Sequence, residues 1–173
     1  TVAYGERECS VQRRHQKLVE ESPCVAITPA IRDQMGKAAC DLARAVGYVG
    51  AGTVEFLFSE GKFYFLEMNT RLQVEHAITE QVTGVDLVQR QLRIALGERL
   101  TVTPEQALTP RAHAIECRIY AEDPDRGFMP APGLVRAIQV PGGPGVRDDR
   151  GAAPGRAIAV FYDTVIARVD VWG

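Results

Sequence analysis

The 173-residue sequence has no run of about 18 or more apolar residues, which excludes a membrane-spanning helix. It has little clustered positive charge: only Arg13, Arg14 and Lys17 form a basic patch, and the formal net charge is −2. A nucleic-acid-binding surface is therefore not predicted. The first residues, Thr1–Gly5, lack the basic and then apolar segments of a secretory signal, so a cytoplasmic location is expected.

The sequence also lacks the short motifs of several large enzyme classes. It has no G-x-G-x-x-G fingerprint, no P-loop and no arrangement of nucleophile, histidine and aspartate. Its cysteines, Cys9, Cys24, Cys40 and Cys117, have neither the spacing of a zinc site nor the density of a disulfide framework. Reduced thiols are therefore expected, in the cytosol or, if the source is eukaryotic, in the mitochondrial matrix.

The composition, 46% hydrophobic and 24% charged, is typical of a soluble globular protein. Thr28 and Pro29 are typical of a helix start, the following apolar residues recur with a period near 3.6, and Gly47 marks the helix end. Alternating apolar residues then predict two strands, Thr53–Phe58 and Phe63–Met68, joined by a turn.

Two shorter helices are predicted next, one over His76–Val82 that stops at Gly84, and one that Asp86 caps and Gly97 ends. Thr101–Pro110 has two prolines and no periodicity, which indicates a linker.

The character of the sequence changes after the linker. Strand-like runs follow at His113–Tyr120, Leu134–Val140 and Ile158–Trp172, and they are separated by loops rich in proline and glycine. We therefore predict an α+β fold with a boundary near residue 105, which divides the chain into residues 1–105 and a mostly β part, residues 106–173.

The stretch from Glu67 to His76 is the most informative part of the chain because every second residue is polar. The polar positions are Glu67, Asn69, Arg71, Gln73 and Glu75. Successive side chains of an extended strand point to opposite faces, so these five would share one face. Carboxylates and amide oxygens are ligands for hard cations, and arginine binds small anions. The pattern predicts a combined metal and anion site, with a solvated strand face as the alternative.

Glu55 is the second acid of the predicted hairpin. It faces Glu67 only if the hairpin has a three-residue loop or a bulge at Gly61, because a plain two-residue turn would put the two acids on opposite faces. Directly opposed like charges destabilise a sheet unless a cation offsets them, and Mg²⁺ could do so. The alternative is that Glu55 points to solvent.

Other charged residues have both functional and structural interpretations. Glu75 could act as a general base beside an anion held by Arg71, or the two could form a structural ion pair. His76 has the opposite parity and is expected to pack. Arg118 lies in a run that looks buried, so it needs a partner, and Glu116 or Glu122 could be that partner.

Several segments together closely resemble biotin carboxylase, the ATP-grasp component of acetyl-CoA, propionyl-CoA, methylcrotonyl-CoA and pyruvate carboxylases. They are Gln12–Lys17 (QRRHQK), Gly50–Phe56 (GAGTVEF), Glu67–His76 (EMNTRLQVEH), Thr83–Leu87 (TGVDL) and Glu116–Pro124 (ECRIYAEDP). The resemblance implies the second half of an ATP-grasp core, an antiparallel sheet with helices, followed by the start of the family's mostly β C-terminal domain.

The resemblance also implies a role for individual residues. Glu55, Glu67 and Asn69 correspond to the ligands of Mg²⁺ or Mn²⁺, and Glu55 and Glu67 thereby contact ATP. Gln12 and His15 correspond to nucleotide-binding residues, and Lys17 to a catalytic lysine near the phosphates. Arg71, Gln73 and the backbone of Val74 correspond to the bicarbonate site. Glu75 corresponds to the base that deprotonates bicarbonate, and Arg118 to the group that stabilises the oxygen of biotin's ureido ring.

A protein of this family is an ATP-dependent ligase that carboxylates biotin on a carrier domain through carboxyphosphate, and it works with a carboxyltransferase component. The family's lid is not found in this chain, so the isolated chain is expected to be inactive. Pro144 stands where the family commonly has an aromatic residue, so the family's homodimer is not expected by that route. The alternatives are a non-catalytic interaction or scaffold module derived from the family, and a related ligase such as the large subunit of carbamoyl phosphate synthetase.

Overall fold

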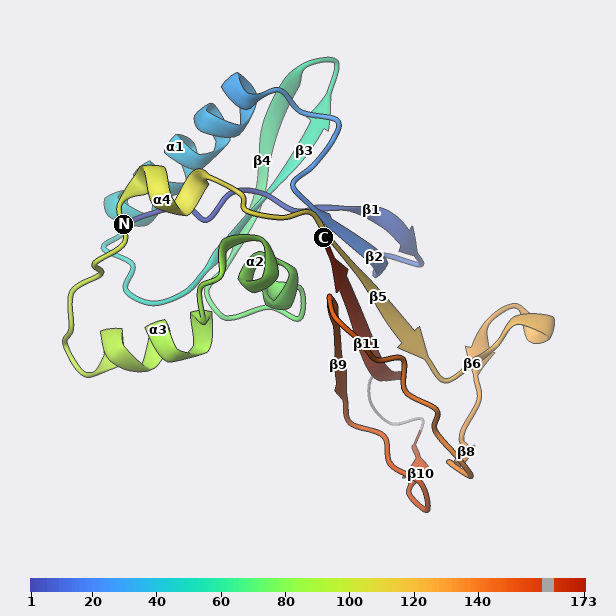
Figure 1. Cartoon of the computed structure of the whole chain (residues 1–173). Helices are drawn as coiled ribbons and strands as arrows, with labels where there is room; N and C mark the ends of the chain where they lie inside the picture. The colour runs from blue at the N-terminus through green and yellow to red at the C-terminus, as the bar shows by residue number, and fades with distance from the viewer. Residues whose placement is uncertain (160–163) are drawn as a thin grey trace. The chain divides into compact units, whose positions relative to one another are not determined.

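The structure, a computed structural model, describes residues 1–159 and 164–173. The chain forms two compact units, and Figure 1 shows their helices and strands. The first unit comprises residues 1–8 and 21–113, and the second comprises residues 9–20 and 114–173. Helices and one β hairpin make up the first unit, whereas the second is built from strands, which confirms the predicted α+β class. The division into family domains at residue 105 stays a prediction.

Helix α1, Pro29–Ala45, begins where the sequence predicts it. The Thr28 side chain accepts a hydrogen bond from the Ile31 amide at 3.3 Å, so one of the free amides at the helix start is satisfied. Beyond the helix, Gly47 has a φ of +63°. This left-handed conformation favours glycine because it has no Cβ to clash with the backbone.

Helices α2, His76–Thr83, and α3, Leu87–Ala95, confirm the two shorter predicted helices. Helix α2 ends at Gly84, whose φ of +71° stops the helix. It is the most buried helix of the first unit by its side chains, with Ile78 at 0% and Val82 at 3% exposure. Among the described residues, no helix combines the length and the apolar character needed to cross a membrane.

The start of α3 provides a test of helix capping. Asp86 Oδ1 accepts a hydrogen bond from the Gln89 amide at 2.7 Å. Asp86→Ala should lower the free energy of unfolding by about 1 kcal/mol, because the amide loses its acceptor. Urea denaturation measures this loss, and Asp86→Asn should lose much less because asparagine caps about as well. An equal loss in both variants would show that the charge of the carboxylate, rather than the cap, stabilises the helix.

The antiparallel hairpin of the first unit consists of β3, Thr53–Ser59, and β4, Lys62–Asn69. Its strands agree with the prediction to within one residue at each end. The turn contains two residues, Glu60 and Gly61, with φ values of +50° and +75°. Two positive φ values are typical of the tight turn that matches the twist of paired strands. The predicted irregularity at Gly61 is therefore wrong.

A β bulge lies at Leu66 instead. Phe56 pairs with Phe65, whereas Glu55 pairs with Glu67, so no residue stands opposite Leu66. The extra residue puts Glu55 and Glu67 on the same face of the hairpin, as the predicted metal site required. It also interrupts the simple alternation along β4, because Phe65 shares a face with Phe56 and therefore points away from Glu67.

The predicted linker contains a short helix, α4, Pro104–Leu108. The Thr103 hydroxyl accepts a hydrogen bond from the Gln106 amide at 3.3 Å, and the Gln106 side chain accepts one from the Thr103 amide at 3.1 Å. This capping box satisfies two amides at once and stabilises a single turn without any hydrophobic periodicity. The short helix inside Thr101–Pro110 was not predicted from the sequence.

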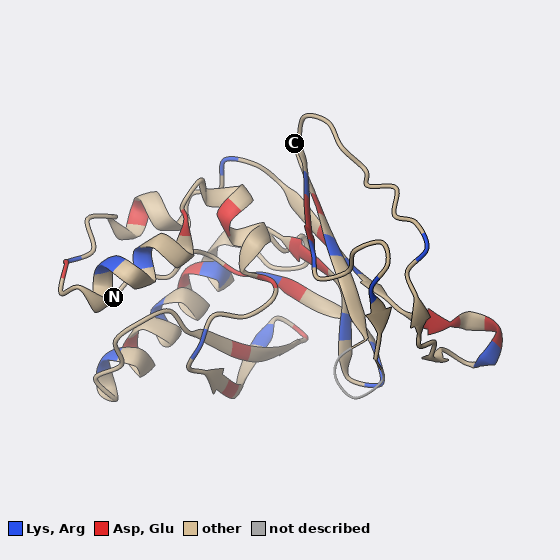
Figure 2. Ribbon diagram, turned by 90° about the horizontal axis from the view of Figure 1, so that it is seen from below, with Lys and Arg blue, Asp and Glu red and all other residues tan. Residues whose placement is uncertain are grey.

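The main sheet of the second unit has the strand order β1–β2–β5–β11–β9. The strands are β1 Glu8–Arg13, β2 Gln16–Ser22, β5 Ala114–Tyr120, β9 Val146–Arg150 and β11 Val165–Trp172. Strand β11 runs antiparallel to both β5 and β9. Figure 2 shows acidic and basic segments close together on the strands of this sheet.

The remaining strands of this unit are short. Strand β6, Glu122–Asp123, pairs with β7, Met129–Pro130, around the 3₁₀ turn η1, Pro124–Arg126. Strand β8, Gly133–Leu134, pairs with β10, Ala157–Ile158.

Two of the three predicted strand-like runs therefore need correction. Residues 135–140 form no strand, so the predicted run Leu134–Val140 is wrong beyond its first residue. The proline and glycine residues on both sides of it leave little length for a ladder. The predicted run Ile158–Trp172 divides between β10 and β11, and its residues 160–163 lie outside the described part of the chain.

Candidate functional site

Two carboxylates and two amides meet at the open end of the β3–β4 hairpin. Glu55 on β3 and Glu67 on β4 are directly opposed. The Asn69 amide nitrogen donates to both acids, at 2.9 Å to Glu67 Oε1 and 3.2 Å to Glu55 Oε1. The Gln73 amide nitrogen donates to the same Glu55 oxygen at 3.0 Å. The predicted convergence is confirmed for these four side chains, here named the acid–amide cluster.

The acid–amide cluster suits a divalent cation. Directly opposed carboxylates repel each other, and the partial positive charge of an amide N–H group offsets a full negative charge only in part. Mg²⁺ binds through one or two carboxylates together with phosphate oxygens and water, and Mn²⁺ takes the same kinds of ligand. Glu55, Glu67 and the amide oxygen of Asn69 fit this donor set. The described residues contain no group of three or more His, Cys, Asp or Glu side chains that could hold a metal.

Strand β4 ends at Asn69, so three of the five alternating polar residues lie beyond the strand rather than on it. Arg71 is exposed and donates from Nη1 to the Leu72 carbonyl oxygen at 3.2 Å. Gln73 and Glu75 are buried, at 8% and 2% exposure. The predicted alternation is therefore wrong beyond Asn69, and Gln73 reaches the cluster from the loop rather than from the strand.

Glu75 lies at the junction of this loop and α2. It occupies the N-cap position of the helix, and its side chain makes no capping hydrogen bond. Val74 before it is half-buried. His76 begins the helix, and its Nδ1 lies 2.8 Å from the Gln73 carbonyl oxygen, so this histidine ties the loop to the helix start.

Arg118 on β5 has a carboxylate partner that the sequence did not reveal. Its Nε donates to Glu20 Oε1 at 2.6 Å, and its Nη2 contacts the same oxygen. Glu116 Oε1 lies farther away, at 3.9 Å from Nε, and Glu122 pairs with Arg13 instead. Glu20 lies on β2, the neighbouring strand, 98 residues earlier in the sequence, and no local spacing relates the two positions.

The candidate nucleotide-binding residues Gln12 and His15 and the candidate catalytic Lys17 lie on the hairpin formed by β1 and β2. Gln12 is exposed and donates to the Cys9 carbonyl oxygen at 2.8 Å. His15 is exposed in the turn with a φ of +64°. Lys17 is half-buried, and its carbonyl oxygen accepts a hydrogen bond from the Tyr120 hydroxyl at 2.8 Å.

The candidate residues are thus divided between the two units. The first unit contains Glu55, Glu67, Asn69, Arg71, Gln73, Val74 and Glu75, and the second contains Gln12, His15, Lys17 and Arg118. The structure brings together the acid–amide cluster within the first unit, and Arg118 with its acidic partners within the second.

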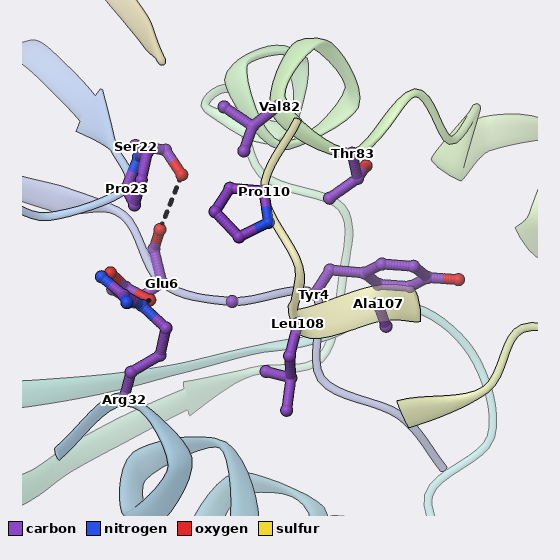
Figure 3. A pocket seen from close by; sticks show the side chains of 11 residues that line it. Tyr4, Glu6, Ser22, Pro23, Arg32, Val82, Thr83, Ala107, Leu108 and Pro110 are labelled. Carbon is purple, nitrogen blue, oxygen red and sulfur yellow. Dashed lines mark hydrogen bonds and ion pairs between the residues drawn. The ribbon is translucent and has the colours of Figure 1, made fainter. Parts of the chain in front are cut away.

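A small cavity of the first unit lies among other residues (Figure 3). Tyr4, Val82 and Pro110 are among its lining residues, and no candidate site residue is. Its volume of about 10 Å³ is that of a single water molecule. Arg32 on its wall pairs with Glu6 at 2.7 Å, and this hydrogen bond raises the pKa of the guanidinium above its usual value. The cavity is a packing feature rather than a ligand pocket.

Two family models match the chain. The model described as "Carbamoyl-phosphate synthase L chain, ATP binding domain" matches residues 1–103, and the model described as "Biotin carboxylase C-terminal domain" matches residues 116–173. The chain is 55% identical over 170 residues to a biotin carboxylase of Nostoc sp. and 52% identical over 175 residues to biotin carboxylase 1 of Bacillus subtilis. These matches cover 98% and 100% of this chain, but only 38% and 39% of the respective relative.

Solved structures of biotin carboxylase domains are also similar to this chain. The biotin carboxylase domain of a thermophilic 2-oxoglutarate carboxylase, bound to bicarbonate, superposes with a TM-score of 0.94 at 48% identity. A second structure, of that domain from Hydrogenobacter thermophilus in complex with MgADP, ADP and bicarbonate, has the same TM-score and identity. Each match covers 98% of this chain and 38% of the solved one.

Proposed function

The chain belongs to the biotin carboxylase family, and we propose that it carries the metal-binding, bicarbonate-binding and general-base residues of an enzyme that carboxylates biotin with ATP and bicarbonate. The acid–amide cluster is the observation that supports this proposal most directly. The match of residues 116–173 to the biotin carboxylase C-terminal domain favours this family over carbamoyl phosphate synthetase. The chain spans 38% of the length of the Nostoc relative, so the carboxylation activity of the whole enzyme is a proposal for this chain.

In this proposal Glu55, Glu67 and Asn69 hold Mg²⁺ or Mn²⁺ against the phosphates of ATP. The cation, when bound, offsets the negative charge of the phosphates during transfer. The chain's own part is to bring the two carboxylates face to face, and the bulge at Leu66 supports that geometry. Gln73 holds the Glu55 carboxylate in place through its hydrogen bond of 3.0 Å.

The loop after the hairpin would hold and activate bicarbonate. The Arg71 guanidinium is a planar fork that matches the oxygens of a small anion, and it is exposed to solvent. Gln73 and the backbone of Val74 complete the proposed bicarbonate site. Glu75 takes the proton of bicarbonate, and the resulting oxyanion attacks the γ-phosphate, which gives carboxyphosphate and ADP.

The second unit would contribute the remaining roles. Gln12 and His15 contact the nucleotide, and Lys17 offsets phosphate charge. Arg118 stabilises the negative charge that develops on the oxygen of biotin's ureido ring when biotin is carboxylated.

The wider setting follows from the same proposal. Biotin reaches the enzyme on a carrier domain, and a carboxyltransferase component receives the carboxyl group. We place the enzyme in the cytoplasm, or in the mitochondrial matrix of a eukaryote. Pro144, in the loop after Val140, argues against the family's homodimer by that route. The family domains would meet near residue 105.

Calorimetry tests the metal site without requiring turnover. Titration of the chain with MgATP, and separately with Mn²⁺, should give a metal-dependent heat. Glu67→Gln should lower the metal affinity about tenfold or more, because one of the two carboxylate ligands is lost. Glu60→Gln, an acid in the turn of the same hairpin, is the matched control and should bind as the unmodified chain does. Equal heats for Glu67→Gln and the unmodified chain would refute the site.

The second candidate function is a non-catalytic interaction or scaffold module derived from the family. Exposed apolar side chains on one face of the β3–β4 hairpin, such as the directly paired Leu57 and Tyr64, which are 58% and 55% exposed, favour a partner surface there. Such a module would bind a carrier domain or another protein component and give no metal-dependent heat, so the same titration separates the two functions.

A further inference from the structure

One face of the main sheet in the second unit carries two rows of charged side chains across β5, β11 and β9. The first row is Glu116, Asp170 and Arg147, and the second is Arg118, Arg168 and Asp149. Paired residues of neighbouring strands share a face, as do residues two apart along one strand, so all six point the same way. Glu20, on the neighbouring strand β2, contacts Arg118 and belongs to the same charged face.

Three acids of this face are fully buried. Glu20, Glu116 and Asp170 each have 0% exposure. Apart from each other, Glu116 and Asp170 have no hydrogen-bond partner for their carboxyl oxygens among the described residues. Their ion pairs are long, at 3.9 Å from Arg118 Nε to Glu116 and 3.9 Å from Arg147 Nε to Asp170. Two adjacent buried carboxylates without donors would be costly if both were ionised.

One proton shared by Glu116 and Asp170 removes this cost. The face carries four acids, Glu20, Glu116, Asp149 and Asp170, against three guanidinium groups, Arg118, Arg147 and Arg168. A single bound proton therefore balances the charge. Burial, together with the negative charges of Glu20 and Asp170, raises the pKa of Glu116 to about 9, and burial also raises the pKa of Asp170.

The location of that proton decides which acid forms the ion pair with the Arg118 guanidinium. The guanidinium is planar and rigid, so the carboxylate that engages its Nε edge also sets the direction of its other edges. Glu20 engages that edge at 2.6 Å, whereas Glu116 stands at 3.9 Å. With Glu116 protonated, Glu20 is the one of these two acids that has a full negative charge.

We propose that Glu20 is a positioning residue for Arg118, and that Glu116 and Asp170 share one proton, which leaves Glu20 as the charged partner of that guanidinium. The inference rests on the proposed function, in which Arg118 acts on the ureido oxygen of biotin. Loss of the shared proton would give Arg118 a second anionic partner two residues away on its own strand. The guanidinium would then be drawn from Glu20 toward Glu116.

The shared proton can be tested on the unmodified chain. Carbon-13 NMR of the side-chain carboxyl groups, followed from about pH 5 to about pH 10, reports the protonation of each acid. We expect the pair of Glu116 and Asp170 to hold one proton at neutral pH and to release it near pH 9. Asp170→Asn identifies the coupled signals. Full ionisation of both carboxyl groups by about pH 6 would overturn the proposal.

The positioning role needs a second measurement, the hydrogen exchange of the Arg118 Nε–H group by nitrogen-15 NMR. Glu20→Gln should speed this exchange about tenfold or more, because a charge-assisted hydrogen bond becomes a neutral one. Glu21→Gln, which removes the neighbouring acid that pairs with His113, is the matched control and should leave the exchange unchanged. Equal exchange in Glu20→Gln and the unmodified chain would refute the positioning role.

Both measurements can be read independently of the proposed function. Neither uses ATP, bicarbonate or biotin, so a chain that binds no metal could still show the shared proton and the protected Nε–H group. The carboxyl titration needs no variant to detect the proton, and it therefore decides whether Glu116 and Asp170 share a proton even if Glu20→Gln fails to fold.

Discussion

Raising the pH from about 4.5 to about 9 is expected to weaken the fold steadily, and Glu116 is expected to cause most of the loss. In the unfolded chain this acid has a pKa of 4.5, whereas in the folded chain burial and neighbouring acids raise its pKa to about 9. Between these values the folded state keeps a proton that the unfolded state has released. The free energy of unfolding therefore falls by up to about 1.4 kcal/mol per pH unit.

The sign of this effect is opposite to that of an ordinary ion-paired carboxylate. The contribution of Glu116 is fully present below pH 4.5 and is lost as the pH rises through about 9. Burial raises the pKa of Asp170 as well, so its contribution runs in the same direction. Urea denaturation at a series of pH values measures the slope.

Glu116→Gln isolates the cause of the slope. Glutamine has nearly the same shape as protonated glutamate and cannot ionise, so the variant should have a much flatter pH profile. It should match the unmodified chain near pH 4.5 and exceed it in stability near pH 9. Glu60→Gln, which changes an exposed acid in the hairpin turn, should keep the original slope. A Glu116→Gln profile as steep as that of the unmodified chain would show that Glu116 does not cause the slope.

The parts of the fold that the sequence predicted correctly are those with local causes. Thr28 and Asp86 each accept a backbone hydrogen bond from a residue three positions later, so the helix starts were visible in a few residues. The short helix α4 has an equally local cause, the capping box of Thr103 and Gln106. Hydrophobic periodicity, the main sequence signal of a helix, cannot appear in a single turn of five residues, so this helix was not predicted.

The parts that failed depend on pairing between distant segments. The run Leu134–Val140 has strand-like composition, but only its first residue belongs to a strand. Strand formation requires a partner at the right distance and register, and composition contains neither. Glu20 was missed for the same reason, since it meets Arg118 only after β2 and β5 become neighbours.

The facing of Glu55 and Glu67 was predicted correctly, but the irregularity behind it was placed wrongly. Glu55 and Glu67 do face each other, but the bulge that allows it lies at Leu66 rather than in the turn. The odd or even position of each residue shows only that an irregularity must exist between the turn and the two acids. It does not show where. Its place depends on which residue can leave the ladder at least cost, and Leu66, with a side chain 52% exposed, has little packing to lose.

Two single-residue deletions in β4 should therefore have opposite effects on metal binding. Deletion of Leu66 removes the unpaired residue and keeps Glu55 opposite Glu67, so Mn²⁺ binding should persist. Deletion of Met68 moves Asn69 to the other face, because a shift of one residue reverses every side chain beyond it. That variant should lose Mn²⁺ affinity about tenfold or more in calorimetry.

The register itself provides a readout that does not depend on the metal. Thr53 pairs with Asn69 in the unmodified chain, and nuclear Overhauser contacts between the two backbones should persist without Leu66 and disappear without Met68. The two variants remove neighbouring apolar residues of one strand, so each is the control for the other. Loss of Mn²⁺ binding in both, with the contact between Thr53 and Asn69 intact in the Leu66 deletion, would mean that the bulge shapes the metal site directly. Loss in the Met68 deletion alone would confirm that the cluster requires only that the side chains share one face.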